Sequence, residues 1–300
     1  MMGDIDQLMS VENALLLDGS FAVRVIEETK EQLRAAENPD GGPVGNMHRM
    51  EKSWLKNTFQ NCYGVFVAPA PEAEDVYEIN DLIIDAAAEA GVVHIIFAMP
   101  AIQHLSMPRY SFPYSYLKNK LKAIENDTRL RVAVLRTPVF YEQMTGSEWL
   151  RFDENGNGVV PAAFRTSLIP GAAIGDMGFV IRMMFRFSEY YSQRIVGLVG
   201  DDLHYFQYAK HMLEACGMEN VAILSSDIAI PETPDRSWGD VDFAGNLSSF
   251  LADRIESYGL HPGMQPYTRW LKRNRTEVAS QLALRLEMSR HDGSKLITGG

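Results

Sequence analysis

The chain has 300 residues, 46% of them hydrophobic and 22% charged, so it is long enough to bury a large core as one domain or as a domain with a smaller lobe. Its formal net charge of −11 argues against a nucleic-acid or an anionic membrane surface as partner. Cys62 and Cys216 are far apart in the sequence, and no apolar run approaches the length of a membrane span. The first residues do not resemble a secretory or transit signal, so a cytoplasmic protein is predicted.

Helices and short strands are predicted to alternate through the first half of the chain. Strands are expected at residues 21–26, 63–68, 92–97 and 131–135. Helices are expected at residues 5–17, 27–36, 51–59 and 72–90. The strands are apolar and β-branched, a pattern typical of strands buried on both faces of a parallel sheet. Their alternation with helices predicts an α/β fold with a doubly wound sheet.

The segment RFDENGNGVVP, residues 151–161, has two interpretations. Asp153, Asn155 and Asn157 match the first half of a calcium-binding EF-hand loop. Phe164 stands where the bidentate glutamate should be, so calcium would lack its main ligand. A β-hairpin is therefore the preferred interpretation.

The rest of the second half is predicted to be less regular. Asp176 is expected to cap a helix, residues 194–200 to form a further sheet strand, and residues 205–216 to form a helix stopped by the next glycine. Helices and loops interrupted by prolines are expected over residues 221–285, and a flexible tail over residues 286–300.

Tyr114 and Lys118 lie four residues apart at the start of a further predicted helix. Four residues are about one helical turn, so the phenol and the ammonium group face the same side. A lysine in this position can lower the pKa of a phenol and make it a proton donor or acceptor. The alternative is that both side chains lie on a solvated helix face, because this spacing is common by chance.

Several stretches together resemble one known family. They are LLLDGSFAVRVI (15–26), NCYGVFVAPA (61–70), IIDAAAEAGVVHIIF (83–97), LRTPVFYEQ (135–143), IGDMG (174–178) and SQRIVGLVGDDLHYFQYAKHMLEACG (192–217). In this order and spacing they resemble the NmrA-like family of atypical short-chain dehydrogenases/reductases, over roughly residues 3 to 275. The resemblance implies a Rossmann-like domain that binds NADP or NAD, residues 1–145, and a smaller C-terminal α/β substrate lobe, residues 146–285, from which strand 194–200 returns to the sheet.

The family includes reductases of quinones and small carbonyl compounds, and sensors of the nicotinamide pool that regulate a partner protein. The resemblance implies that Lys118 is the active-site lysine. It also implies that Tyr114 lies where members carry tyrosine or another hydrogen-bonding residue. A functional Tyr114–Lys118 pair is therefore the preferred interpretation.

The segment that aligns with the dinucleotide-binding motif departs from the family pattern. The motif needs a strand, a G-x-x-G-x-x-G loop and a helix whose first amides meet the pyrophosphate. Here no strand precedes the loop, which reads GDIDQLM and keeps only Gly3. Leu8 and Met9 would block the approach of the backbone to phosphate, and Asp4 and Asp6 add negative charge.

Further cofactor determinants of the family are absent. Glu28, preceded by another glutamate, stands where NADP-binding members carry an arginine for the 2′-phosphate, and like charges ~4 Å apart cost on the order of 1 kcal/mol in water. His48 replaces an acidic residue near the adenine, and Ala98 replaces the serine beside the tyrosine. NADP or NAD binding is therefore predicted to be weak or absent, in a sheet whose first strand is missing or replaced.

A truncated gene model would explain the absent strand, but it would not explain Leu8, Met9, Glu28 or Ala98. Losing a central strand would expose the edges of its neighbours. We therefore expect a rearranged N-terminal helix, a shifted strand, a protein partner or a second copy of the chain to cover that region.

Ligand contacts are predicted at Arg136 and Phe140, because the carboxyl ends of the strands are the usual functional edge of such sheets. Arg136 could bind a ligand anion or pair with Glu142. His94, which follows a turn, is expected at the surface or as a cap. No histidine or cysteine lies at metal-ligand spacing, so no metal site is predicted.

Two functional interpretations follow. The first is an NmrA-like protein that binds a small organic ligand and has impaired or lost NAD(P) binding. It would act through a Tyr114–Lys118 acid–base step, such as an enolisation, or as a degenerate sensor or scaffold. The alternative is an ordinary NAD(P)H-dependent oxidoreductase of a small carbonyl or quinone substrate. The sequence leaves open whether the protein is an enzyme.

Overall fold

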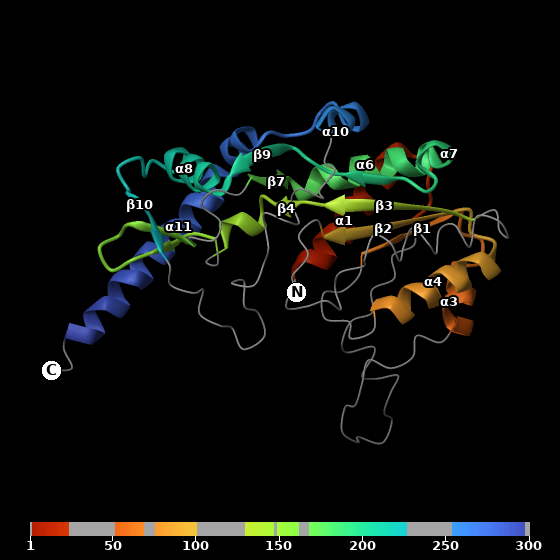
Figure 1. The fold of residues 1–300 in the computed structure, drawn as a ribbon, viewed down its shortest axis with the longest axis horizontal. Helices are drawn as coiled ribbons and strands as arrows, with labels where there is room; N and C mark the ends of the chain where they lie inside the picture. Colours follow the sequence, from red (N-terminus) through yellow and green to blue (C-terminus); the bar gives the residue numbers. More distant parts are fainter. Residues whose placement is uncertain are drawn as a thin grey trace, which may run out of the picture. The chain divides into compact units, whose positions relative to one another are not determined.

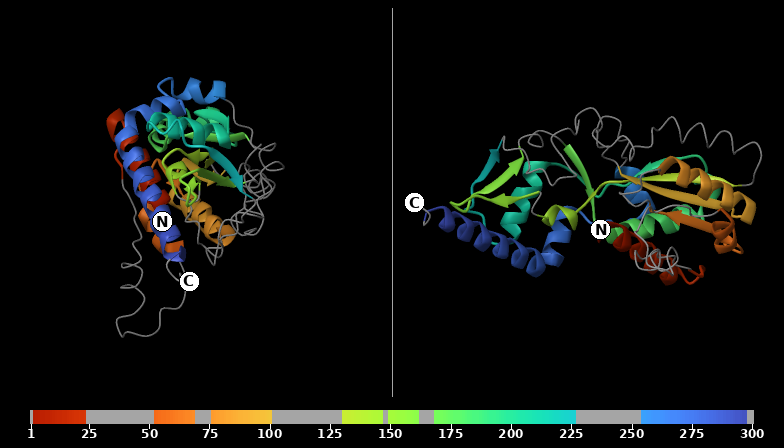
Figure 2. Two further views of the ribbon diagram at one scale, coloured as in Figure 1. Left: turned by 90° about the vertical axis from the view of Figure 1, so that its left-hand side faces the viewer. Right: turned by 90° about the horizontal axis from the view of Figure 1, so that it is seen from below.

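The computed structural model describes residues 2–23, 52–68, 76–100, 130–146, 149–161, 168–226 and 254–297 (Figures 1 and 2). The chain forms two compact units. Unit 1 comprises residues 1–99, 112–134 and 181–195, and unit 2 comprises residues 100–111, 135–180 and 196–300. Neither unit is a continuous segment of the sequence. In the described ranges no helix is both long enough and apolar enough to span a bilayer.

The largest described sheet contains the four apolar runs that were predicted as strands and that lie within the described residues. Its strand order is β1 (Gly64–Val67), β2 (His94–Pro100), β3 (Arg131–Thr137) and β8 (Ile195–Gly197). β1 and β2 are parallel, with Gly64 opposite His94. Ile95 and Ile96 are 0% exposed, as expected for a strand covered on both faces. Of the strand predicted at residues 21–26, the first three residues have no regular structure and the others lie outside the described residues.

Two predicted helices of unit 1, α3 (Lys52–Phe59) and α4 (Val76–Ala90), pack against each other. The buried face of α4 carries Ile83, Ile84, Ala86 and Ala87, all at most 6% exposed. Its small alanines allow close packing. On the exposed side, Lys52 forms ion pairs with Asp85 and Glu89, which are 3.5 and 2.7 Å away.

Helix α1 (Met2–Asp18) confirms and extends the first predicted helix. Val11, Ala14 and Leu15 follow helical spacing and are at most 8% exposed, so they form its buried face. The helix ends at Asp18 and is followed by Gly19, whose φ of +70° favours glycine and whose N–H donates to the Leu16 carbonyl at 3.1 Å.

The last turns of α6 (Ile174–Arg186) belong to unit 1 and are followed by α7 (Ser188–Tyr191). Arg182 and Arg186 lie 3.6 and 3.5 Å from the Asp18 carboxylate. The Phe185 ring meets the edge of the His94 ring, with centroids 5.5 Å apart. His94 is 0% exposed, so its prediction as a surface or capping residue is wrong, because the ring is covered as part of the core.

Unit 2 contains two three-stranded sheets. The first has the order β4 (Val139–Phe140), β7 (Leu168–Ala172) and β9 (Asp201–His204), with β7 parallel to β4 and antiparallel to β9. The second has the order β10 (Ile223–Ser226), β6 (Gly158–Pro161) and β5 (Arg151–Phe152). β5 and β6 are antiparallel, which confirms the predicted hairpin. In its turn, Asp153 Oδ1 accepts the N–H groups of Asn155 and Asn157 at 3.0 and 2.7 Å.

Helices α8 (Tyr205–Ala215) and α11 (Tyr267–Ile297) of unit 2 pack around an aromatic core together with the short 3-10 helix η1 (Gln143–Thr145). Helix α10 (Arg254–Leu260) precedes α11 in the chain. α8 ends as predicted before Gly217, whose φ is +77°. α11 continues through most of the predicted flexible tail. Leu282 is 0% exposed, and Arg285 donates to the carbonyls of Gly146 and Leu150 at 3.0 and 3.1 Å, contacts that favour a longer helix.

Candidate functional site

Residues Gly3 to Met9, which align with the dinucleotide-binding loop, all lie within α1. Leu8 is half-buried and Met9 is 50% exposed. In an α-helix the backbone N–H groups beyond the first turn bond to carbonyls four residues earlier. This segment is therefore part of a helix that begins at Met2, and not a loop.

Four residues that the sequence assigned to the cofactor and to catalysis lie outside the described residues: Glu28, His48, Tyr114 and Lys118. Ala98, which replaces the serine of the family, lies on β2 and is 2% exposed. The functional Tyr114–Lys118 pair stays a prediction.

The two predicted ligand contacts lie at or after the carboxyl end of β3. Arg136 is half-buried, and burial lowers the pKa of its guanidinium from the ordinary value. Phe140, on β4, is only 2% exposed, which favours a packing role for its ring. The alternative pairing of Arg136 with Glu142 stays a prediction.

Glu142 joins β4 to the start of α6. Its carboxylate accepts the Ile174 N–H at 3.1 Å and the Trp270 Nε1–H at 3.1 Å. Burial raises the pKa of this carboxyl, and the nearby charge of Asp176 also raises it. Hydrogen bonds to the carboxylate oppose this rise.

Asp176 lies within the first turn of α6, because the helix begins at Ile174, so its prediction as the N-cap is wrong. Its side chain is 4% exposed. One oxygen accepts the Gln265 N–H at 2.8 Å, and the other lies 3.2 Å from His261 Nε2. The His261 ring is stacked on the Phe179 ring, with centroids 4.6 Å apart and planes 7° apart. We call Glu142, Asp176, His261 and Gln265 the Asp176 cluster.

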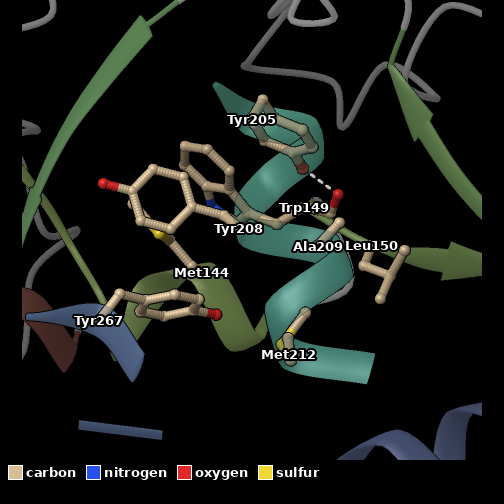
Figure 3. A pocket seen from close by; sticks show the side chains of 8 residues that line it. All are labelled: Met144, Trp149, Leu150, Tyr205, Tyr208, Ala209, Met212 and Tyr267. Carbon is tan, nitrogen blue, oxygen red and sulfur yellow. Dashed lines mark hydrogen bonds between the residues drawn. The ribbon is translucent and has the colours of Figure 1, made fainter. Parts of the chain in front are cut away.

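A second feature of unit 2 is a small cavity in its aromatic core (Figure 3). It is lined by Met144, Trp149, Leu150, Tyr205, Tyr208, Ala209, Met212 and Tyr267. The cavity has a volume of about 10 Å³, roughly the room for one water molecule. Figure 3 shows the aromatic rings and methionine side chains gathered around it. It is too small for an organic ligand and belongs to the packing of the core.

Among the residues that the structure describes, no group of three or more His, Cys, Asp or Glu side chains could hold a metal ion.

No family model matches the chain. Solved structures do. An NADPH-dependent quinone oxidoreductase from Escherichia coli, solved with NADPH, is 15% identical with a TM-score of 0.63, over 89% of this chain and 95% of the other. A nucleoside-diphosphate-sugar epimerase from Staphylococcus aureus is 14% identical with a TM-score of 0.62, over 89% and 96% of the two chains. The negative transcriptional regulator NmrA is 15% identical with a TM-score of 0.61, over 89% and 91%.

The chain has the NmrA-like fold. At identities of 14–15% the likeness concerns the fold, and it extends over most of each chain. The predicted Rossmann-like architecture is therefore confirmed. A shared fold does not fix chemistry, which depends on the residues of the site.

Within this NmrA-like fold, sequence reasoning missed the Asp176 cluster. Asp176 was noted only as a cap and Glu142 only as a partner for Arg136, and His261 was not singled out. Asp176 and His261 are 85 residues apart, and no spacing rule links them. A loop before α11 brings them together.

Proposed function

We propose that this chain is an NmrA-like protein that binds a small organic ligand and has impaired or lost NADP and NAD binding. It works as a sensor or scaffold rather than as a nicotinamide-dependent reductase. The observation that carries the proposal is the helical conformation of Gly3 to Met9, where the motif needs a glycine loop.

Electrostatics supports the same proposal. In the sequence, Asp4 and Asp6 add negative charge to the segment that aligns with the dinucleotide-binding loop. Negative charge there opposes the binding of a pyrophosphate. Leu8 and Met9 add Cβ atoms where the family motif has bare backbone.

The proposal is tested by calorimetric titration of the purified protein with NADPH and with NADH. We expect no saturable binding of either dinucleotide up to about 1 mM, a concentration that corresponds to roughly −4 kcal/mol. The quinone oxidoreductase from Escherichia coli, titrated with NADPH in the same buffer, is the positive control. Micromolar saturation would overturn the proposal and favour the alternative, an NAD(P)H-dependent oxidoreductase of a carbonyl or quinone.

A second candidate, a non-redox acid–base step, rests on Tyr114 and Lys118 in the sequence. Tyr114→Phe removes the hydroxyl and keeps the ring. An unchanged biological output of this variant would support the sensor or scaffold, and a lost output would support acid–base chemistry. The titration with nicotinamide cofactors comes first because it separates both candidates from the reductase.

A protein partner or a second copy of this chain remains part of the proposal, as the cover for an unpaired edge of the largest sheet. Sedimentation of the purified chain tests the second copy. A dimer at micromolar concentration is the expected result, and a monomer would leave only a heterologous partner.

A further inference from the structure

The Asp176 cluster contains a histidine held in one orientation. His261 Nε2 lies 3.2 Å from Asp176 Oδ1. A carboxylate only accepts hydrogen bonds, so Nε2 carries the proton and donates it. The ring lies flat on Phe179, which restricts its rotation. Asp176 thereby fixes both the tautomer and the orientation of the imidazole.

In that tautomer, the other ring nitrogen, Nδ1, has a free lone pair. None of the described hydrogen bonds uses His261 Nδ1, and it is not one of the buried, unpartnered polar atoms of the described residues. The side chain is 16% exposed, so the ring is partly open to solvent, and a Cβ built on Gly263 would lie 3.7 Å from Nδ1. An oriented imidazole whose second nitrogen is used by none of the described hydrogen bonds is an arrangement that can take a proton from a reacting group.

Asp176 is itself held in place. Its second oxygen accepts the Gln265 N–H at 2.8 Å, and its side chain is 4% exposed. The alternative is a purely structural role, in which Asp176 only anchors the turn between His261 and Gln265. The two interpretations differ at Nδ1, because an anchor needs no free lone pair on the far side of the ring.

We propose that Asp176 and His261 form a proton-accepting dyad for non-redox chemistry on a small neutral carbonyl compound, with His261 as the general base and Asp176 as its positioning residue. In ester hydrolysis, Nδ1 takes a proton from water while the water oxygen forms a bond to the carbonyl carbon. The carbon–oxygen bond to the leaving group then breaks, and the protonated imidazole returns its proton to the solvent. Glu142 and Asp176 place negative charge nearby, which disfavours anionic substrates. No step depends on a nicotinamide, so the dyad and the proposed function are tested separately.

The probe is p-nitrophenyl acetate, a neutral activated ester whose hydrolysis is followed by the release of p-nitrophenolate. We expect the full-length protein to hydrolyse it and His261→Asn to lose about 100-fold of that rate, a typical contribution of a general base. Asp176→Asn keeps an oxygen for the Gln265 N–H but removes the charge. It should lower kcat and leave KM unchanged, whereas a purely structural role would change both or neither.

His211 supplies the matched control, because its Nδ1 lies 3.4 Å from a Glu214 carboxylate oxygen on the exposed side of α8. His211→Asn should retain the full rate. An equal rate in the wild type and in His261→Asn would overturn the proposal.

If the His261 variant does not fold, labelling of the wild type with diethyl pyrocarbonate, read by mass spectrometry, decides the question. His261 should react faster than His211, although its side chain is only 16% exposed against 35% for His211. The reverse order would show an unreactive His261 and would overturn the proposal.

Discussion

His94 is an uncharged base held inside unit 1. Both of its ring nitrogens are buried, and neither has a hydrogen-bond partner among the residues that the structure describes. Burial lowers the pKa of His94 to about 4, and the charge of Arg131 also lowers it. The unfolded chain has the ordinary histidine pKa of about 6.5, so it binds more protons between pH 6.5 and pH 4. The contribution of neutral His94 to the free energy of unfolding is therefore complete above pH 6.5 and is lost as the pH falls toward 4.

Replacing His94 by leucine should flatten this pH dependence. The pKa difference corresponds to about 3 kcal/mol in the unfolding free energy between pH 7 and pH 4. Urea denaturation at several pH values measures it. We expect a smaller loss of stability in His94→Leu than in the wild type, and an unchanged loss in the control His211→Asn. Parallel curves for His94→Leu and the wild type would contradict the assignment.

Tyr267 carries a hydroxyl that is fully buried and has no hydrogen-bond partner among the described residues. Burial raises the pKa of the phenol, so it stays neutral. The adjacent cavity has room for about one water, but its wall is formed mainly by aromatic, aliphatic and methionine side chains, which bind water poorly. The hydroxyl therefore costs desolvation without a compensating bond.

Tyr267→Phe removes only this oxygen and keeps the ring contacts with Tyr141 and Tyr208, whose centroids lie 5.0 and 4.8 Å away. We expect the free energy of unfolding to rise by about 1 kcal/mol, measured by urea denaturation at pH 7. Tyr208→Phe is the matched control, because the Tyr208 hydroxyl lies 3.0 Å from the Ile169 carbonyl. This control should lose stability. A loss in Tyr267→Phe as well would mean that its hydroxyl has a partner.

At the scale of single elements, two glycines show opposite constraints. At Gly64 on β1, any larger residue would place its Cβ 2.5 Å from Cε1 of the Phe185 ring. Gly175 in the first turn of α6 has nothing within 4 Å of such a Cβ. The strand therefore has no room for a methyl group at position 64, whereas the helix has room for one at position 175.

Alanine at these positions should change stability in opposite directions. Gly64→Ala forces Phe185 to move in a packed core, which costs about 1 to 3 kcal/mol. Gly175→Ala restricts the unfolded chain and suits a helix, which stabilises by about 0.5 to 1 kcal/mol. Denaturant midpoints of the two variants measure both effects. Changes of the same sign would show that the contact with Phe185 does not decide the residue at position 64.

For the whole molecule, the local sequence pattern predicts the strands of the largest sheet and the β5–β6 hairpin, and it misses the other strands of the small sheets of unit 2. Each strand of the largest sheet includes an apolar stretch that is legible in the sequence. β4, β7 and β9 are short, and β7 contains Pro170 and Gly171, residues that weaken a strand pattern. The pairing of β7 with β9 places Leu168 opposite His204, residues far apart in the sequence, so no local pattern predicts it.

The same distinction holds for the candidate sites. The helix over Gly3 to Met9 could be predicted from its local sequence, whereas the loss of cofactor binding there stays a prediction. The Asp176–His261 pair could not be predicted, because each residue taken alone fits an ordinary capping or loop role. The chemistry of the Asp176–His261 pair depends on tertiary contacts, and no local sequence pattern predicts such contacts.

The segments that form unit 1 predict how a fragment of residues 1–180 should behave. Residues 181–195 complete unit 1 although they follow much of unit 2 in the sequence. They hold β3 through the Gln193 N–H to the Val132 carbonyl at 2.7 Å and the Val134 N–H to the Arg194 carbonyl at 3.0 Å. They also supply Phe185, which packs against Gly64. A fragment of residues 1–180 leaves β3 as an open edge and removes these contacts.

We therefore expect fragment 1–180 to lack cooperative unfolding and its β2 amides to exchange hydrogen within minutes. In the full chain the same amides should be protected to nearly the global stability. Co-expression with residues 181–300 is the control, and it should restore protection because it restores β8 and the end of α6. A cooperative transition in fragment 1–180 alone would show that its first three described strands form a stable sheet without β8.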